Sequence, residues 1–158
     1  MSAARGEFRA APPVDPEIEA FEAGYIDPQR FDHEAHVRVA WSYLQRLPTP
    51  LAIARFTSAL RSLTVRLGVP QKYHETVTWF FMIVIADRLA GAPADDWETF
   101  SEDNRDLLED GAALLRRHYS PARLASVDAR QRFLLPDRAP SSQNPEDPRT
   151  GPRSGPSS

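Results

Sequence analysis

Residues 75–90 read ETVTWFFMIVIADRLA, the most apolar stretch of the chain. The apolar run from Val77 to Ala86 is interrupted only by Thr78, and it is shorter than the roughly 20 residues that span a bilayer. Its β-branched and aromatic residues would also suit a strand, but sixteen unbroken residues before Gly91 favour a helix. Because apolar side chains lie on nearly every side of this helix, we predict that it is buried at the centre of the fold.

Helical patterns continue on both sides of this central segment. Apolar residues recur at spacings of three and four, and polar residues fill the opposite face. Helices are predicted at residues 16–25, 33–46, 50–67, 103–118 and from 121 towards 133. Short connections make consecutive helices antiparallel. We therefore predict an all-α fold, a single-domain up-and-down helical bundle of about five to six helices.

Capping residues mark the ends of several predicted helices. Asp32 and Thr49 are expected as N-caps of the second and third helices, and Ser120 as the N-cap of the last. Gly68 follows the third helix at a position that favours a left-handed stop. These boundaries agree with the hydrophobic period of each segment.

The two ends of the chain differ in composition from its middle. Residues 137–158 are rich in Pro, Ser and Gly and hold no aliphatic side chain larger than alanine. Such a segment cannot bury enough apolar surface to offset the entropy lost on ordering. We expect a flexible leader over residues 1–13, a helical domain over residues 14–136 and a disordered tail over residues 137–158.

Composition narrows the classes of function. With 41% hydrophobic and 26% charged residues, the chain is typical of a soluble globular protein. A net charge of −3 without a basic stripe argues against nucleic acid as a partner, and the lack of a long apolar run argues against a membrane. The chain has no cysteine, so disulfides and thiolate catalysis are excluded. Residues 1–13 lack the apolar core of a signal peptide, and a cytoplasmic location is expected.

Three of the four histidines fall in two short clusters, each at the start of a predicted helix. His33 and His36 lie in Phe31-Asp-His-Glu-Ala-His36, and His74 lies in Tyr73-His-Glu-Thr-Val-Thr78. An antiparallel bundle places both helix starts at the same end. His118 returns to that end if the connection before the fifth helix does not reverse its direction. We therefore expect the histidines to gather in one region.

The spacing of the first cluster suits a metal ion. Residues three apart on a helix share a face, so both imidazoles can reach one ion. The leading hypothesis is that His33, His36 and His74 hold one divalent ion, iron or zinc, with an open coordination position for water or dioxygen. The protein would then be a small metal-dependent enzyme acting on a small organic molecule.

Residues beside His74 offer further roles in such an enzyme. Tyr73 or Glu75 would act as an acid, a base or a partner of a ligand, and Thr76 would orient the substrate. The chain lacks H-E-x-x-H and E-x-x-H, the patterns of the best-known helical metal enzymes. Two alternatives therefore stay open. One is a metal-free acid–base enzyme of the isomerase or lyase type, and the other is a non-enzymatic binding module whose histidines link helices by hydrogen bonds.

The motifs resemble those of a group of small, uncharacterised, mostly bacterial proteins. Shared features are an F-x-H-x-x-H stretch, a Y-H-x-T-x-T stretch, and a later Tyr-Ser and Pro-Asp ending, here Tyr119-Ser120 and Pro136-Asp137. The resemblance covers about residues 20–137 and carries no activity with it. It implies that the residues in the defining motifs include His33, His36, Tyr73, His74 and Thr76.

Overall fold

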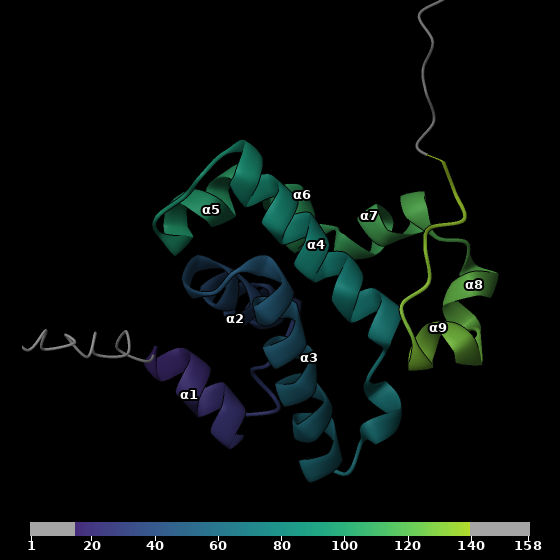
Figure 1. The fold of residues 1–158 in the computed structure, drawn as a ribbon, viewed down its shortest axis with the longest axis horizontal. Coiled ribbons are helices and arrows are strands. Elements are labelled where there is room, and N and C mark those ends of the chain that lie inside the picture. Colours follow the sequence, from purple (N-terminus) through teal and green to yellow (C-terminus); the bar gives the residue numbers. More distant parts are fainter. Residues whose placement is uncertain (1–14, 140–158) are drawn as a thin grey trace, which may run out of the picture.

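The computed structural model describes residues 15–139, and within them the chain is helical without a strand (Figure 1). The predicted all-α class is confirmed, although the nine α-helices of the described residues exceed the five to six expected. The elements are α1 Pro16–Ala23, α2 His33–Arg46, α3 Thr49–Arg66, the 3-10 helix η1 Pro70–Lys72, α4 Glu75–Gly91, α5 Trp97–Asp103, α6 Arg105–Glu109, α7 Gly111–His118, α8 Pro121–Ala125 and α9 Val127–Gln131.

Helix α4 is the central element, as its sequence predicts. It packs against α2 and α3 on one side and against α9 on another, and it runs diagonally across the view in Figure 1. Thr76, Met82 and Ile85 are fully buried, and Phe80 is nearly so. Burial on several sides explains why the helix lacks a polar face.

Helices α1, α2 and α3 enclose an aromatic core. The ring of Phe21 stacks on Phe56 with centroids 5.4 Å apart, and Tyr43 meets Phe56 edge-on at 5.6 Å. The phenol of Tyr43 donates a hydrogen bond to Glu22 (2.9 Å), which also pairs with Arg55 (2.7 Å). Together these contacts fix the short α1 to both longer helices.

Of the three predicted N-caps, two are present and one is displaced. The carboxylate of Asp32 accepts from the amide of Ala35 (2.9 Å), and Ser120 accepts from the amide of Arg123 (3.1 Å). Thr49 is itself helical, so its predicted capping role is wrong. Pro48 is the N-cap, with extended backbone and a carbonyl that accepts from the amide of Ala52 (2.9 Å). The proline carbonyl starts the helix one residue early.

The predicted single helix over residues 103–118 is wrong, because α5 ends at Asp103 and the two short helices α6 and α7 follow it. The backbone leaves the helical region at Asn104 and Asp110, with ψ values of 38° and 40°. The Asn104 amide donates to the carbonyl of Phe100 (2.8 Å), and its oxygen accepts from Arg88 (2.9 Å). Side-chain bonds to Asn104 therefore replace the helical ladder at this point.

Residues 119–138 fold back along α4, with α9 packed on its N-terminal half. Tyr119 donates to the carbonyl of Leu134 (2.8 Å), and Ser120 binds the carboxylate of Asp137 through its amide (2.7 Å) and hydroxyl (2.5 Å). The amide of Arg138 donates to the carbonyl of His118 (3.0 Å). We call this segment, residues 119–138, the C-terminal clasp. It includes Asp137 and Arg138, which were expected in the tail. Residues 140–158 of that tail and the expected leader lie outside the described residues.

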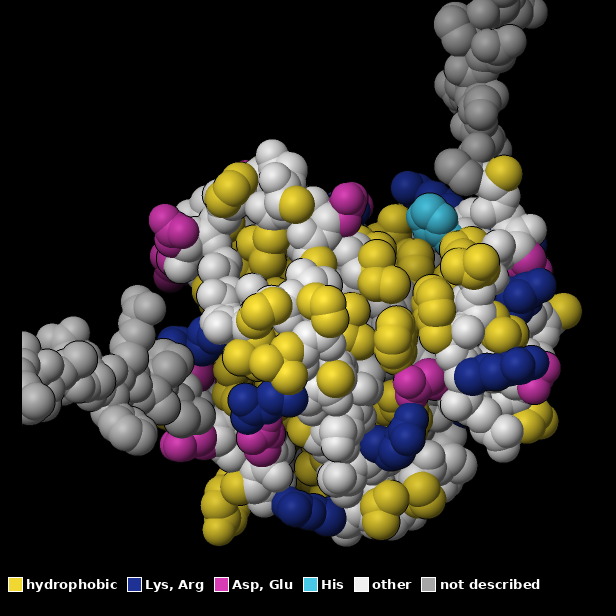
Figure 2. Space-filling view, viewed as in Figure 1, with side chains coloured by type: hydrophobic (Ala, Val, Ile, Leu, Met, Phe, Trp, Pro, Cys, Tyr) yellow, Lys and Arg dark blue, Asp and Glu magenta, His cyan; other side chains and the backbone are white. Residues whose placement is uncertain are grey.

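Within residues 15–139, no helix combines the length and apolar character needed to cross a membrane. Hydrophobic side chains gather over α3 and α4 on the face shown in Figure 2, and the acidic and basic side chains around them are scattered.

Candidate functional site

A pocket of about 630 Å³ lies between α2, α3, α4 and η1. This size falls within the range of small-molecule sites in proteins. Its walls are mainly apolar, and the polar residues that line it are Asp32, His33, His36, Thr64, Lys72, Tyr73, His74 and Thr78. The sequence-predicted histidine clusters therefore border one cavity.

The apolar and polar parts of the pocket lie at different ends. Ala40, Phe56, Met82 and Ile85 come from the middle of the three long helices, and each is at most 3% exposed. The polar residues come from the starts of α2 and α4, the end of α3, and η1. The cavity therefore has an apolar interior and a polar mouth.

His33 links α2 to the junction between α6 and α7. Its Nε2 atom lies 2.9 Å from the carbonyl of Leu107, and only a protonated nitrogen can donate to that oxygen. The ring also meets Phe81 of α4 edge-on, at 5.0 Å between centroids. The first histidine of the motif thus joins three segments that are distant in sequence.

We predict that Gly111→Ala lowers the free energy of unfolding by about 1–3 kcal/mol. A Cβ at Gly111 would lie 2.5 Å from Nε2 of His33, so the ring would have to move and lose its bond to Leu107. Gly91→Ala is the control, because nothing lies within 4 Å of its Cβ position. Urea unfolding measures both changes, and an equal effect of the two substitutions would contradict the close contact.

His36 lines the pocket, and only one of its two ring nitrogens has a hydrogen-bond partner in the described residues. Its Nδ1 atom donates to the carbonyl of Asp32 (2.6 Å), so the lone pair of the neutral ring lies on Nε2. That nitrogen has no hydrogen-bond partner within residues 15–139. The ring stacks on Phe31 with centroids 3.8 Å apart. Burial lowers the pKa of His36 below its usual 6.5, and the nearby His33 lowers this pKa further, while the Asp32 carbonyl partly opposes the shift.

His74 is the N-cap of α4, and both of its ring nitrogens are engaged. Nδ1 accepts from the amide of Val77 (3.3 Å), and Nε2 donates to the carbonyl of Leu124 (2.8 Å). The two contacts require the same tautomer, with hydrogen on Nε2. His74 thus starts the central helix and ties it to the C-terminal clasp.

The structure does not support the predicted metal centre. Among the described residues, no group of three or more His, Asp or Glu side chains is placed to hold an ion. His33, His36 and His74 line the same pocket, but a ligand needs a free nitrogen, and His74 has none. His118 does not line the pocket; its ring packs against Phe80, with centroids 5.3 Å apart.

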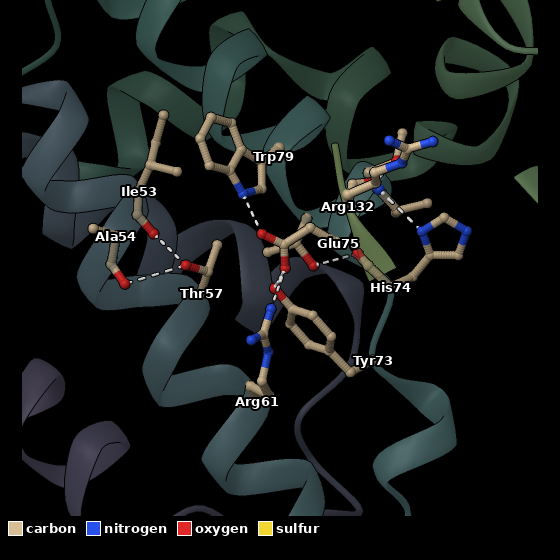
Figure 3. Close-up of polar contacts among 12 residues, drawn as sticks. Ile53, Ala54, Thr57, Arg61, Tyr73, His74, Glu75, Trp79 and Arg132 are labelled. Atoms are coloured by element: carbon tan, nitrogen blue, oxygen red, sulfur yellow. Dashed lines mark hydrogen bonds and ion pairs between the residues drawn. The ribbon is translucent and has the colours of Figure 1, made fainter. Parts of the chain in front are cut away.

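Glu75 lies at the centre of a hydrogen-bonded cluster rather than in the pocket (Figure 3). Its carboxylate accepts from Trp79 (2.7 Å), Arg61 (2.6 Å) and the phenol of Tyr73. Burial raises the pKa of Tyr73, and the bond to Glu75 raises it further. Tyr73 also lines the pocket, so this cluster fixes one part of the mouth.

Thr76 holds the C-terminal clasp and does not reach the pocket, where we expected it to orient a substrate. Its hydroxyl donates to the carbonyl of Arg132 (2.9 Å) and accepts from the amide of Leu134 (3.1 Å). Beside it, Trp79 stacks on Phe133 with centroids 5.3 Å apart. The Y-H-x-T motif therefore has a structural role in this fold.

Sequence patterns gave no separate signal for the walls of the pocket. Phe56, Leu60 and Leu63 belong to the apolar stripe of α3, and the same stripe would also form an ordinary core. Lys72 stands out as the one lysine of the chain, but nothing in the sequence places it at a cavity. Comparison of the chain with protein-family models, curated proteins and solved structures finds no match.

Proposed function

We propose that this protein binds a small, mainly apolar organic molecule in the pocket and that His36 acts on it as a general base without a metal ion. One observation carries the proposal: His36 lines a largely apolar cavity of about 630 Å³, and one of its imidazole nitrogens has no partner in the described residues. A lowered pKa keeps this ring neutral, and a neutral ring accepts protons. The reaction would be a proton transfer of the isomerase or lyase type.

The other histidines support this assignment through their contacts. His33 and His74 donate to backbone carbonyls 74 and 50 residues away in sequence, which suits helix linkers. His36 bonds only to the carbonyl of Asp32 at the start of its own helix. Its Nε2 can therefore accept and release a proton without breaking a long-range contact.

Binding is tested first with a neutral fluorescent probe, N-phenyl-1-naphthylamine. We expect saturable binding to the wild-type protein and a loss of affinity of about tenfold or more in Leu67→Trp, since Leu67 lines the mouth and the larger ring would block it. Val65→Trp is the matched control, because Val65 is 62% exposed and does not line the pocket. Equal affinity of the two variants would contradict binding in this pocket.

Base catalysis is tested with 5-nitrobenzisoxazole. Removal of its C–H proton breaks the N–O bond and releases the coloured 2-cyano-4-nitrophenolate. Transfer of this proton to Nε2 of His36 should make the wild type faster than His36→Gln by about 10²-fold or more. His118→Gln should keep the wild-type rate, because His118 lies outside the pocket. A rate that His36→Gln leaves unchanged, or that EDTA abolishes, would contradict the proposal.

The pH dependence of stability gives an independent prediction. The pKa of His36 is lower in the folded protein than its usual 6.5, so below pH 6.5 the unfolded state binds more protons. The contribution of the neutral ring is complete above that pH and is lost as the pH falls through the folded pKa. Lowering the pH from about 7.5 to 5 should therefore destabilise the wild type more than it destabilises His36→Gln. Thermal unfolding at each pH measures both changes. Parallel losses in both proteins would argue against a buried neutral ring.

A further inference from the structure

Two fully charged side chains line the pocket, Asp32 and Lys72, and only one of them has a partner in the described residues. The carboxylate of Asp32 is the N-cap of α2 and accepts from the amide of Ala35 (2.9 Å). Lys72 is exposed and makes no ion pair within residues 15–139. Lys72 is thus the one lysine or arginine among the lining residues, and its ammonium group has no ion-pair partner in the described residues.

The backbone beneath this lysine is held firmly. In η1 the amide of Lys72 donates to the carbonyl of Val69 (2.9 Å), and the next amide, of Tyr73, donates to Pro70 (3.2 Å). Arg130 of the clasp donates to the carbonyl of Gln71 (2.8 Å). The Cα of Lys72 is therefore fixed at the mouth, while its ammonium group sits on a flexible four-carbon stem.

The opposite end of the pocket has no charged side chain that could pair with a charged ligand group. Phe56, Met82 and Ile85 are all but fully buried, and no arginine lines the cavity. A charged group placed there would lose its hydration without gaining a partner. A ligand that uses both ends has an apolar body and an anionic group.

We infer that the occupant of this pocket is an amphipathic organic anion, with its apolar body between α2, α3 and α4 and its carboxylate or a similar anionic group paired with Lys72. This inference rests on the proposed function, because it names the class of molecule that enters the same pocket. It also explains how a substrate is oriented: the anion stays at the mouth, and the carbon skeleton extends past His36.

The test uses two probes with the same body. 8-Anilinonaphthalene-1-sulfonate is N-phenyl-1-naphthylamine with an added sulfonate. Lys72→Gln should weaken binding of the sulfonate by about three- to fivefold, the range of an exposed ion pair, and leave the neutral probe unchanged. Lys72→Arg should restore the affinity for the sulfonate. Raising the NaCl concentration should shrink the difference between wild type and Lys72→Gln.

Arg105→Gln is the matched control, because it removes the same charge from an exposed residue that does not line the pocket. If Lys72→Gln and Arg105→Gln weakened binding of the sulfonate equally, the effect would come from the net charge of the protein. That result would overturn the inference. Binding of the neutral probe with no effect of Lys72→Gln on the sulfonate would overturn it as well, and would leave the proposed function intact. Failure of both probes to bind would overturn the proposed function itself.

Discussion

Replacing Thr76 by valine is expected to lower the free energy of unfolding by about 2–3 kcal/mol. Valine keeps the shape of threonine but removes the hydroxyl that donates to Arg132 and accepts from Leu134. Thr76 is fully buried, so no water replaces these bonds at the threonine itself. The carbonyl and the amide of the clasp each lose a partner, and each costs about 1 kcal/mol or more. Urea unfolding monitored by circular dichroism gives the value.

Thr78→Val separates this effect from the general cost of losing a threonine. The Thr78 hydroxyl donates to the carbonyl of His74 (2.8 Å), which already accepts from the amide of Thr78 (3.0 Å). Its removal leaves that carbonyl satisfied, and we expect a loss below about 1 kcal/mol. Amide exchange at Leu134 should accelerate in Thr76→Val alone. If the two valine variants were equally stable, the clasp would not depend on Thr76.

Replacing Glu75 by glutamine is expected to cost about 2–3 kcal/mol, although the side chains have nearly the same shape. The carboxylate of Glu75 accepts from Trp79 and Arg61 as well as from Tyr73, and three donors need an acceptor with no hydrogen of its own. A glutamine amide would turn a donor towards one of these donors. The Trp79 fluorescence should shift as its indole loses a partner.

Glu34→Gln is the control for this substitution. Glu34 lies in the first turn of α2, as Glu75 does in α4, so both changes remove a favourable charge from a helix start. Glu34 is exposed, and its expected cost is a few tenths of a kcal/mol. A large loss in Glu75→Gln with intact binding of N-phenyl-1-naphthylamine would identify Glu75 as a structural residue. Equal stability of the two variants would contradict the hydrogen-bonded cluster.

Local patterns were sufficient to predict the helices that position the pocket. The apolar run after Glu75, the cap at Asp32 and the stripe of α3 each depend on neighbours in sequence, and each lies where it was expected. The breaks after α5 and α6 could not be predicted in this way. Asn104 ends a helix because Arg88, sixteen residues earlier on α4, binds its side chain. Such tertiary contacts override the helical pattern of the segment.

The candidate site shows the same division. The expected antiparallel order of the helices predicted that His33, His36 and His74 would gather in one region, and all three line one cavity. Their separate roles depend on the carbonyls of Leu107 and Leu124, which no local motif reveals. The metal hypothesis assumed that each imidazole was free. A long-range hydrogen bond occupies Nε2 of His33, and one long-range and one local bond occupy both nitrogens of His74.

The C-terminal clasp also sets the order in which a growing chain can complete its pocket. The first turn of α4 is fastened by contacts with Leu124, Arg132 and Leu134, about fifty to sixty residues later in the sequence. The pocket-lining residues of α2 and α3 leave the ribosome long before these three residues do. Domains fold from the N-terminus as they emerge. Until residue 134 has left the ribosome, the first turn of α4 lacks these partners. Shortening the gene from its 3′ end beyond this codon should therefore turn a folded product into a substrate for chaperones and proteases.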